Sequence, residues 1–461
     1  MPRSRVPLTV VVLAAGQGTR MRSTIIKLLH PVAGQPMVTR TLDSVAALRP
    51  SRVVTVVGFQ ADQVRRTLDD RDCDFVLQKE QRGTGHAVLQ AARKIGSRST
   101  VLIVSGDVPL IRPTTLRAFV NRHRKAGAAL SVMTTLLDDP SGYGRVVRDS
   151  RSRIERIVEH KDASRSEREI AEINTGIYCA KASLLLPVLR GLKPNNVQGE
   201  YYITDAVEQL IGKGERVLAV CHAQADEVLG VNTRQELARA SATLYARKAE
   251  ELQTGGVTLL DAARTWVDPR ARIGRDSTLY PAVIIEGPTV LGRGCTVLPG
   301  TRIVNCKLGR DVMVKDHCVL LDSRIGDAAE IGPFAHLRPG NSLGDRTRVG
   351  NYVELKKTEL GQGTKAPHLS YLGDASIGPN CNIGAGTITC NYDGSRKHPT
   401  TLARGVFIGS DAQLVAPVTV HEGAYVAAGT TVTEDVPAGA LAIGRSRQRN
   451  IRGWVKRHKK K

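Results

Sequence analysis

Residues 325–349 read IGDAAEIGPFAHLRPGNSLGDRTRV, and every sixth residue is aliphatic: Ile325, Ile331, Leu337, Leu343 and Val349. A period of six fits neither the 3.6-residue repeat of a helix nor the two-residue alternation of a strand. It fits a coil with three short faces, in which each six-residue unit forms one face and points its aliphatic residue inward. The stretch therefore predicts a parallel β-helix of hexapeptide repeats.

The same period covers most of the sequence after Trp266, with small shifts of phase. Its first members are Ile273, Leu279, Ile285, Leu291, Val297 and Ile303, and its last are Ile408, Leu414, Val420, Val426 and Val432. The period is interrupted between Thr389 and Ile408 by a segment that contains Asn-Tyr-Asp-Gly and Pro399. We expect part of this segment to leave the coil as a loop.

The first 232 residues have a different pattern, in which apolar runs alternate with helical periodicity. The expected strands are Val10–Leu13, Val53–Val57, Asp74–Leu77 and Val101–Val104, and the expected helices are Met37–Leu48, Gln60–Leu68, Gly85–Ile95 and Thr114–Arg124. This alternation predicts an α/β domain, Rossmann-like, with a mostly parallel sheet that binds ligands at the carboxyl ends of its strands. Residues 233–254 contain no Gly or Pro and are expected to form a linker helix, so that the β-helix domain comprises 255–461.

The composition restricts the class of protein. The chain has 461 residues, of which 41% are hydrophobic and 24% charged, as in globular proteins. An apolar run of about 18 residues would indicate a membrane span, and the sequence contains none. Without a secretory signal we expect a cytoplasmic protein with no membrane partner. The eight cysteines show no C-x-x-C spacing, which favours reduced thiols over a zinc site.

The net charge of +22 favours anionic partners such as nucleotides, sugar phosphates and coenzyme A. Aromatic residues make up only 4% of the chain, so stacking surfaces for single-stranded nucleic acid are few and nucleic-acid binding is unlikely. A basic tail, residues 445–461, contains nine Lys or Arg residues and no acidic residue. Such a tail is usually a solvated end.

Two motifs in the first half suit phosphate chemistry. The segment Leu13-Ala14-Ala15-Gly16-Gln17-Gly18-Thr19-Arg20-Met21 follows the first strand, where small residues let backbone N–H groups approach phosphate oxygens. Asp107 follows another strand and could hold Mg²⁺ on a triphosphate. Taken singly, each could equally be a structural turn.

Together these motifs resemble those of the sugar-phosphate nucleotidylyltransferases, whose signature is Leu-Ala-Ala-Gly-x-Gly-Thr-Arg-Met followed by Pro-Lys. Lys27 keeps its place, whereas Ile26 replaces the usual proline. The resemblance implies that Lys27 and Arg20 are catalytic and that Asp107 and Asn232 bind Mg²⁺. It implies a binding site for UTP and UDP-N-acetylglucosamine formed by Leu13, Ala14, Ala15, Gly16, Lys27, Gln78, Gly83, Thr84, Gly144, Glu159, Asn174 and Asn232.

Polar clusters interrupt the six-residue period at Arg338-Pro339-Gly340, Glu354-Leu355-Lys356-Lys357, His368-Leu369-Ser370-Tyr371-Leu372-Gly373-Asp374, Asn382-Ile383-Gly384-Ala385-Gly386 and Cys390-Asn391-Tyr392-Asp393-Gly394. This series is similar to that of the acetyltransferase half of a family of bifunctional uridylyltransferase/acetyltransferases. By that similarity His368 is the general base of acetyl transfer. The implied sugar-phosphate site comprises Arg338, Lys356, Tyr371, Asn382, Asn391, Tyr392 and Lys397, and the implied acetyl-CoA site comprises Ala385, Ser410, Ala428 and Arg445. The family implies a left-handed coil and a homotrimer. Pro367 before His368, and His336 where arginine is common, depart from its pattern.

The resemblance covers nearly the whole chain and implies an enzyme with two activities. It transfers acetyl from acetyl-CoA to glucosamine 1-phosphate, then uridylyl from UTP to N-acetylglucosamine 1-phosphate, for peptidoglycan and cell-wall synthesis. Two alternatives stay open: a nucleotidylyltransferase with a non-catalytic β-helix, and a basic scaffold that binds RNA. Release of coenzyme A thiol would argue against the first, and salt-sensitive RNA binding without turnover would favour the second.

Overall fold

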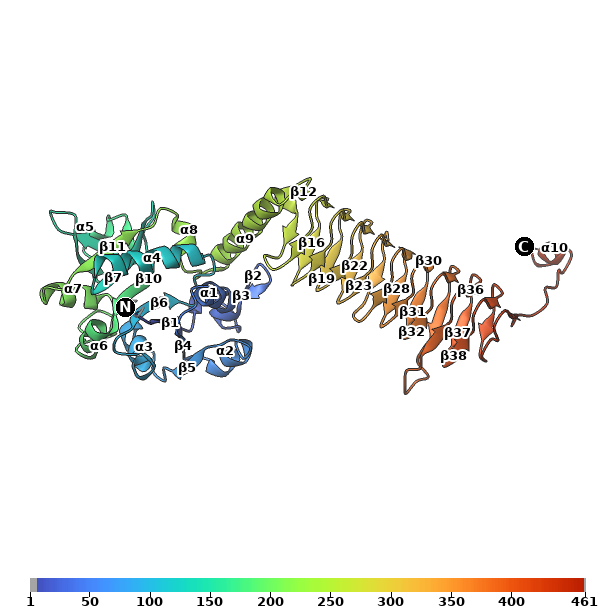
Figure 1. Cartoon of the computed structure of the whole chain (residues 1–461), viewed down its shortest axis with the longest axis horizontal. Helices are drawn as coiled ribbons and strands as arrows, with labels where there is room; N and C mark the ends of the chain where they lie inside the picture. Colours follow the sequence, from blue (N-terminus) through green and yellow to red (C-terminus); the bar gives the residue numbers. More distant parts are fainter. Residues whose placement is uncertain (1–5, 460–461) are drawn as a thin grey trace, which may run out of the picture. The chain divides into compact units, whose positions relative to one another are not determined.

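The computed structural model describes residues 6–459, so residues 1–5 and the last two lysines of the expected basic tail, Lys460 and Lys461, lie outside the described residues. The chain divides into two compact units, the first up to Leu244 and the second from Tyr245 (Figure 1). Within residues 6–459, no helix combines the length and apolar character that a membrane span requires.

The first unit contains a nine-stranded sheet with the central order β11-β7-β10-β6-β1-β4-β5, to which β8 and β9 are added beside β10. The strands are β1 (Leu8–Ala14), β4 (Arg52–Val57), β5 (Asp74–Leu77), β6 (Thr100–Ser105), β7 (Leu130–Leu136), β8 (Arg145–Arg148), β9 (Ile154–Val158), β10 (Glu172–Lys181) and β11 (Val217–Cys221). β1, β4, β5 and β6 contain the four strands predicted from the sequence, and they pair in parallel.

Helices cover both faces of this sheet. They are α1 (Met37–Ala46), α2 (Ala61–Thr67), α3 (Thr84–Gln90), α4 (Pro113–Ala126), α5 (Arg165–Arg168), α6 (Ala182–Arg190), α7 (Asp205–Gly212) and α8 (Ala225–Val228), and α9 (Arg234–Thr254) follows them. Short elements complete the unit: β2 (Pro31–Val32), β3 (Gln35–Pro36) and the 3₁₀ turns Thr19–Met21, Lys27–Leu29 and Ala92–Lys94. The consecutive residues Val10 and Val11 of β1 point to opposite faces and belong to separate buried clusters, as expected for a sheet enclosed on both sides.

Within the central order of seven strands, one strand departs from the parallel arrangement. β10 runs antiparallel to both of its neighbours, β6 and β7. It follows the antiparallel pair β8 and β9, without the long helical crossover that a parallel connection needs. The alternation of strands and helices, on which the prediction rested, does not extend to this part of the chain. The sheet is therefore mixed.

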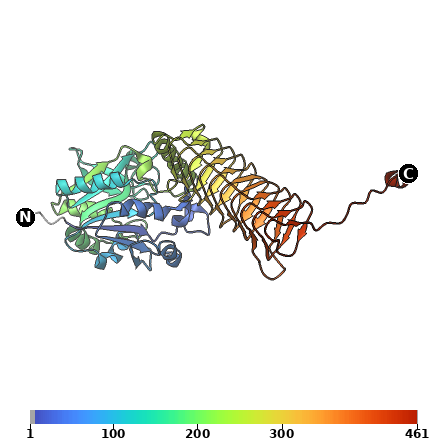
Figure 2. The same ribbon diagram turned by 45° about the vertical axis from the view of Figure 1, so that its right-hand side comes forward.

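The second unit is a parallel β-helix whose turns stack along one axis (Figures 1 and 2). Each strand pairs with the third strand along the chain, except that β39 pairs with β41 at the end, and this builds three sheets of 11, 10 and 9 strands. The first sheet comprises β12 (Thr258–Leu259), β15 (Thr278–Leu279), β18 (Thr296–Val297), β21 (Met313–Val314), β24 (Glu330–Ile331), β27 (Arg348–Asn351), β30 (Lys365–His368), β33 (Asn382–Ile383), β36 (Phe407–Ile408), β39 (Tyr425–Val426) and β41 (Leu441–Ala442). This is the parallel β-helix that the six-residue period predicts, and it is the left-handed fold that the family resemblance implies.

The other two sheets repeat this arrangement. The second comprises β13 (Trp266–Val267), β16 (Ile284–Glu286), β19 (Arg302–Val304), β22 (Val319–Leu321), β25 (His336–Leu337), β28 (Glu354–Lys356), β31 (Tyr371–Gly373), β34 (Ile388–Cys390), β37 (Gln413–Val415) and β40 (Thr431–Val432). The third comprises β14 (Arg272–Ile273), β17 (Val290–Leu291), β20 (Lys307–Leu308), β23 (Arg324–Ile325), β26 (Ser342–Leu343), β29 (Glu359–Leu360), β32 (Ala375–Ile377), β35 (Thr400–Leu402) and β38 (Val418–Val420).

The aliphatic residues of the six-residue period fill the interior of the coil. Ile331, Leu337, Val349 and Ile408 are fully buried, and Ile273, near the first turn, is only partly buried. The predicted loop is confirmed, because β34 ends at Cys390 and residues 391–399 precede β35. After the last strand, the chain leaves the coil and ends near the short helix α10 (Trp454–His458) (Figure 2).

Candidate functional sites

Three segments that are far apart in the sequence meet at the ammonium group of Lys27. Lys27 forms an ion pair with the carboxylate of Asp107, and its Nζ donates a hydrogen bond of 2.9 Å to Oδ1 of Asn232. The guanidinium of Arg20 donates to the same oxygen, also at 2.9 Å. Two oxygen acceptors and two cations thus form one compact cluster.

The topology of the sheet explains this meeting. β1 and β6 are adjacent and parallel, so Leu13 lies opposite Ser105, and the amide of Gly106 donates to the carbonyl of Leu13 at 2.9 Å. The segment Leu13-Ala14-Ala15-Gly16 and Asp107 therefore leave the sheet at the same edge. That edge is where open α/β sheets bind their ligands.

Asp107 carries a negative charge in this setting. Burial favours the neutral acid, but the charge of Lys27 and hydrogen bonds from Lys27 and Ser105 outweigh it and lower the pKa of Asp107 below its ordinary value. The side chains of Lys27 and Asp107 are each 13% exposed. Water and salt consequently screen this ion pair less than a surface pair.

The backbone around the cluster is tightly fitted. A Cβ placed on Gly230 would lie 2.9 Å from Oδ1 of Asp107, so a larger residue there would displace the carboxylate. Ile26 has φ −56° and ψ 138°, which are angles that proline adopts, and its side chain is buried. The isoleucine thus keeps the backbone geometry that the usual proline would impose before Lys27.

Two clefts of the first unit flank the Lys27 cluster. One, of about 550 Å³, is lined by residues 19–22 and 233–235. The other, of about 680 Å³, is lined in part by Tyr143, Gly230, Val231 and Glu236. Groups bound in these clefts would lie beside the side chains that surround Lys27.

Gln78, Gly83 and Thr84 come together at the start of α3. The Gln78 side chain is buried, and its Nε2 donates to the carbonyl of Gly83 at 3.2 Å and lies 3.0 Å from Nδ1 of His86. Gly83 has φ 100°, and a Cβ there would lie 2.7 Å from the carbonyl oxygen of Tyr201. This position therefore requires glycine.

Gly144, Glu159 and Asn174 form a second group in the first unit. A Cβ on Gly144 would lie 3.3 Å from Oε2 of Glu159, and the amide of Asn174 donates to the carbonyl of Gly144 at 2.9 Å. The hydroxyl of Thr204 donates to Oε1 of Glu159 at 3.2 Å. Burial raises the pKa of Glu159 despite that hydrogen bond, and the charge of Asp205 adds to the rise.

In the β-helix, His368 is the exposed last residue of β30. Its Nδ1 lies 2.9 Å from Oδ1 of Asn351, the residue in register with it on β27. An amide oxygen can only accept, so Nδ1 carries the proton and Nε2 keeps its lone pair. Pro367 leaves this pairing in register. An imidazole held in this way can accept a proton from a substrate.

The expected acetyl-CoA residues lie along one corner of successive turns. The amide of Asp411, next to Ser410, donates to the carbonyl of Ala385 at 2.7 Å. The amide of Gly429, next to Ala428, donates to the carbonyl of Ser410 at 2.8 Å. The guanidinium of Arg445 donates to the carbonyl of Ala428. His368 lies one turn earlier along the same corner. Next to it, the carbonyl of Leu369 accepts a hydrogen bond of 2.9 Å from the amide of Gly386, which follows Ala385.

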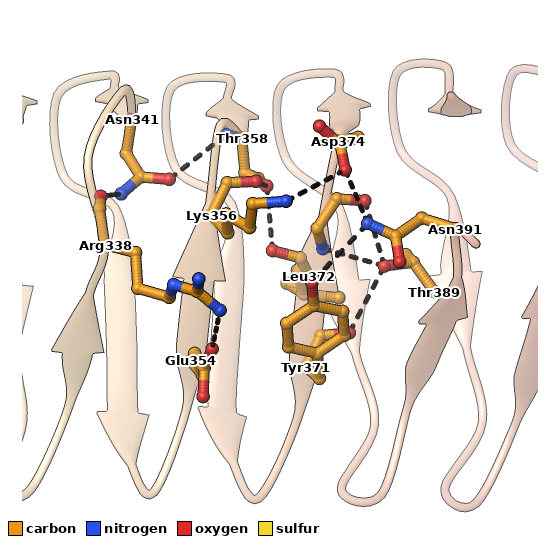
Figure 3. A network of polar contacts seen from close by, with 11 residues as sticks. Arg338, Asn341, Glu354, Lys356, Thr358, Tyr371, Leu372, Asp374, Thr389 and Asn391 are labelled. Carbon is orange, nitrogen blue, oxygen red and sulfur yellow. Dashed lines mark hydrogen bonds and ion pairs between the residues drawn. The ribbon is translucent and has the colours of Figure 1, made fainter. Parts of the chain in front are cut away.

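A polar network lies on the neighbouring sheet (Figure 3). Lys356 Nζ is 3.6 Å from Oδ2 of Asp374, and Nδ2 of Asn391 donates to the same oxygen at 2.5 Å. Nδ2 of Asn391 also lies 3.4 Å from the hydroxyl of Tyr371. The network joins three successive turns and orients one lysine, one amide and one phenol.

The loop of residues 391–399 brings a second lysine to this network. The side chain of Lys397 lies beside that of Lys356, and this contact and the charge of Lys356 lower the pKa of Lys397. Asp393 holds the loop, because its Oδ1 accepts the amides of Ser395 and Arg396 at 2.7 Å each. Two neighbouring ammonium groups favour an anion such as a phosphate.

The remaining expected sugar-site residues are more dispersed. Arg338 pairs with Glu354 at 3.1 Å on the second sheet, and the hydroxyl of Tyr392 donates within its own loop at 2.6 Å. Asn382 lies on the first sheet, in register with Lys365. His336 also lies on the second sheet, in register with Glu354. The single chain therefore divides these residues between two faces of the coil.

Two residues at these sites were not predicted from the sequence. Asn351 precedes His368 by 17 positions, which is one turn of this coil, and that spacing is the signal that could have found it. Glu236 accepts the amides of Asn232 and Thr233 with one carboxylate oxygen. The sequence pattern that could have found Glu236 is Thr-x-x-Glu, which is typical of a helix capping box.

The oxygen atoms beside Lys27 are of the kind that binds Mg²⁺. Asp107 offers a carboxylate and Asn232 an amide oxygen, and both already face a cation. Mg²⁺ in nucleotide sites is commonly held by one or two such groups together with phosphates. Within residues 6–459, no group of three or more His, Cys, Asp or Glu side chains is arranged to hold a metal ion.

Comparisons with known proteins give one family match to part of the chain and relatives that cover nearly all of it. The MobA-like NTP transferase domain family matches residues 10–173. The bifunctional protein GlmU of Geobacillus thermodenitrificans is 48% identical over 448 residues, covering 97% of each chain. GlmU of Pelobacter propionicus is 48% identical over 456 residues, covering 98% of this chain and 99% of its own. A solved UDP-glucose pyrophosphorylase complexed with UDP-glucose is 18% identical, with a TM-score of 0.43, and covers 53% of this chain and 100% of its own.

A nucleotidyltransferase domain followed by a hexapeptide β-helix defines a two-domain transferase of sugar phosphates. The chain belongs to the family of the bifunctional protein GlmU. It is both a glucosamine-1-phosphate acetyltransferase and a uridylyltransferase, and it makes UDP-N-acetylglucosamine for peptidoglycan and the cell wall. This result sets aside the non-catalytic β-helix and the RNA-binding scaffold.

Proposed function

We propose that residues 1–232 carry uridylyl transfer, that residues 255–461 carry acetyl transfer, and that residues 233–254 link them. The phosphate and metal candidates of the first unit lie in the α/β fold, whereas His368 lies in the β-helix. The boundary between the compact units, after Leu244, falls inside α9. Each activity would then depend on its own set of side chains.

The Lys27 cluster is the proposed centre of uridylyl transfer. A phosphate oxygen of N-acetylglucosamine 1-phosphate attacks the α-phosphorus of UTP, and the bond to pyrophosphate breaks as that group takes the electron pair. Lys27 and Arg20 neutralise charge on the phosphates, and the Leu13–Gly16 backbone donates N–H groups to them. The contact of Lys27 with both Asp107 and Asn232 is the observation that carries this proposal.

Mg²⁺ is the proposed metal, held by Asp107 and Asn232. When bound, it would offset the charge of the triphosphate. The lowered pKa of Asp107 keeps its carboxylate ionised and able to act as a ligand.

The two remaining groups of the first unit are the proposed recognition sites. The amide of Gln78 and the backbone at Gly83 and Thr84 suit the edge of uracil, because amides supply both a donor and an acceptor. Glu159 and Asn174, beside Gly144, suit the hydroxyl and N-acetyl groups of the sugar. The burial of Glu159 strengthens its hydrogen bonds to such groups.

His368 is the proposed base of acetyl transfer. Its Nε2 takes a proton from the amine of glucosamine 1-phosphate as the nitrogen attacks the thioester carbonyl, and coenzyme A leaves as the thiolate. Lys356, Lys397 and Arg338 bind the sugar phosphate as cations. The proposed orienting residues are Tyr371, Asn382, Asn391 and Tyr392, and the proposed coenzyme A residues are Ala385, Ser410, Ala428 and Arg445.

A homotrimer is the proposed assembly, in the cytoplasm. Two observations support a site completed by a second copy. His368 is exposed, and Asn382 lies on a different face of the coil from Tyr371. The molecular mass in solution, by light scattering, tests this proposal: a folded, active monomer would contradict it.

Each proposed centre can be tested through its own product. The enzyme is incubated with glucosamine 1-phosphate, acetyl-CoA, UTP and Mg²⁺, and free thiol and pyrophosphate are measured separately. We expect Lys27→Ala to reduce pyrophosphate release by about 100-fold or more, as loss of a transition-state charge does, and to leave thiol release unchanged. Normal pyrophosphate release from N-acetylglucosamine 1-phosphate and UTP by this variant would contradict the assignment.

A further inference from the structure

Glu236 occupies an unusual place in the first turn of α9. Its Oε2 accepts the amide of Asn232 at 2.5 Å and the amide of Thr233 at 3.1 Å, and its own amide donates to the hydroxyl of Thr233 at 3.2 Å. The exchange with Thr233 is a helix capping box. The bond to Asn232 is additional, and it ties the carboxylate to the residue whose side chain contacts Lys27.

The side chain of Asn232 is held from several directions. Its Nδ2 donates to the carbonyl of Gly230 at 3.1 Å, and its Oδ1 accepts from Lys27 and Arg20 at 2.9 Å each. The bond from its backbone amide to Glu236 fixes the main chain from which this side chain extends. Loss of that bond would release the main chain at Asn232 and make the position of its amide oxygen beside Lys27 less well defined.

The carboxylate of Glu236 also lies near other groups of the site. Burial, followed by the charges of Glu236 and Asp107, raises the pKa of Tyr143. Glu236 and Tyr143 line the same cleft as Gly230. The first turn of α9 is therefore part of the wall around the Lys27 cluster.

We propose that Glu236 is a positioning residue for uridylyl transfer, which holds the amide oxygen of Asn232 toward Lys27 and the metal position. The inference rests on the proposed role of Asn232. Glu236 does not touch the reacting atoms. It acts through the backbone of Asn232, as residues beyond the ligands orient metal sites in other proteins.

The test compares Glu236→Ala with Glu236→Gln in the full chain. Removal of the acceptor should lower kcat of uridylyl transfer by about 10-fold and raise the half-saturating Mg²⁺ concentration, because residues beyond the ligands typically contribute 10- to 100-fold. Glutamine still offers an oxygen to both amides, so Glu236→Gln should stay within about threefold of the parent. Glu250→Ala, at an exposed position of the same helix, is the matched control. Acetyl transfer, measured as thiol release, should be unchanged in all three variants and reports folding.

The outcomes separate this inference from the proposed function. If Glu236→Ala lowers the unfolding temperature but leaves the Mg²⁺ dependence and kcat unchanged, Glu236 is only a helix cap and the inference fails. Equal losses of kcat in Glu236→Ala and Glu236→Gln would also overturn it, because the loss would then not come from the missing oxygen acceptor. Asn232→Ala is measured in parallel: full uridylyl transfer by that variant would overturn the role of Asn232 itself.

Discussion

Nδ1 of His368 lies 2.9 Å from Oδ1 of Asn351, one turn of the β-helix below it. Because the amide oxygen accepts only, the bond selects the tautomer whose Nε2 is free to take a proton. This arrangement results from the register of the β-helix, because Asn351 is the last residue of β27 and His368 is the last residue of its paired strand β30. A base that is oriented by a second side chain is the usual arrangement in enzymes that activate a nucleophile.

Asn351→Ala should slow acetyl transfer without affecting uridylyl transfer. We expect kcat to fall by about 10-fold or more, but by less than the roughly 10²- to 10⁴-fold loss that follows removal of a general base. Asn351→Asp keeps an oxygen acceptor for Nδ1 of His368, so it should retain more acetyl transfer than Asn351→Ala. Ser376→Ala, at an exposed position of the β-helix, is the control. Equal losses for Asn351→Ala and Asn351→Asp would contradict the pairing.

Gly230→Ala should impair uridylyl transfer through steric contact. The new Cβ would lie 2.9 Å from the carboxylate of Asp107 and push it out of position. We expect kcat to fall by about 10-fold, as small displacements of catalytic groups commonly cause. Gly212→Ala is the matched control, because a Cβ at that glycine would meet no atom within 4 Å. Equal activity of the two variants would show that Asp107 is not positioned by this glycine.

The raised pKa of Glu159 predicts a pH dependence of sugar-phosphate binding. A carboxyl whose pKa is raised takes up its proton at a higher pH than an ordinary glutamate, so it loses its charge earlier as the pH falls. The KM for N-acetylglucosamine 1-phosphate should therefore rise on acidification before ordinary carboxyls titrate. Glu159→Gln should abolish this rise, and titration of the substrate phosphate would remain in both proteins. The same rise in both would show that Glu159 is not its source.

Lys397→Ala should weaken binding of glucosamine 1-phosphate. Loss of one of two adjacent cations should raise the KM by about 10-fold and reduce its dependence on salt. Lys307→Ala, an exposed lysine on another sheet of the coil, is the control. If the KM is unchanged while acetyl transfer is normal, the loop of residues 391–399 does not bind the phosphate.

The fold could be predicted from the sequence in the part of the chain where a short repeat, the six-residue period, determines the structure. Each aliphatic residue of the six-residue period, such as Leu337 or Val349, must be buried, and only a three-faced coil buries all of them. The direction of β10 was not predictable in this way. It depends on which strand the chain returns to after β8 and β9, and no residue of β10 carries that information.

The sites were predictable only in part, for a related reason. Arg20, Lys27 and Asp107 belong to motifs that follow strands, so their convergence at one edge followed from the topology of the sheet. Asn351 and Glu236 act through single hydrogen bonds to other residues of the site. Such bonds depend on register and backbone geometry, which the sequence motifs did not include.

We propose that two separate centres share this chain, one at Asp107 and one at His368. The most direct test measures both activities in Asp107→Ala and His368→Ala, with the unfolding temperature of each variant as a control for folding. We predict that Asp107→Ala loses uridylyl transfer and keeps acetyl transfer, and that His368→Ala shows the reverse. Loss of both activities in either folded variant, or full activity in both, would contradict the account.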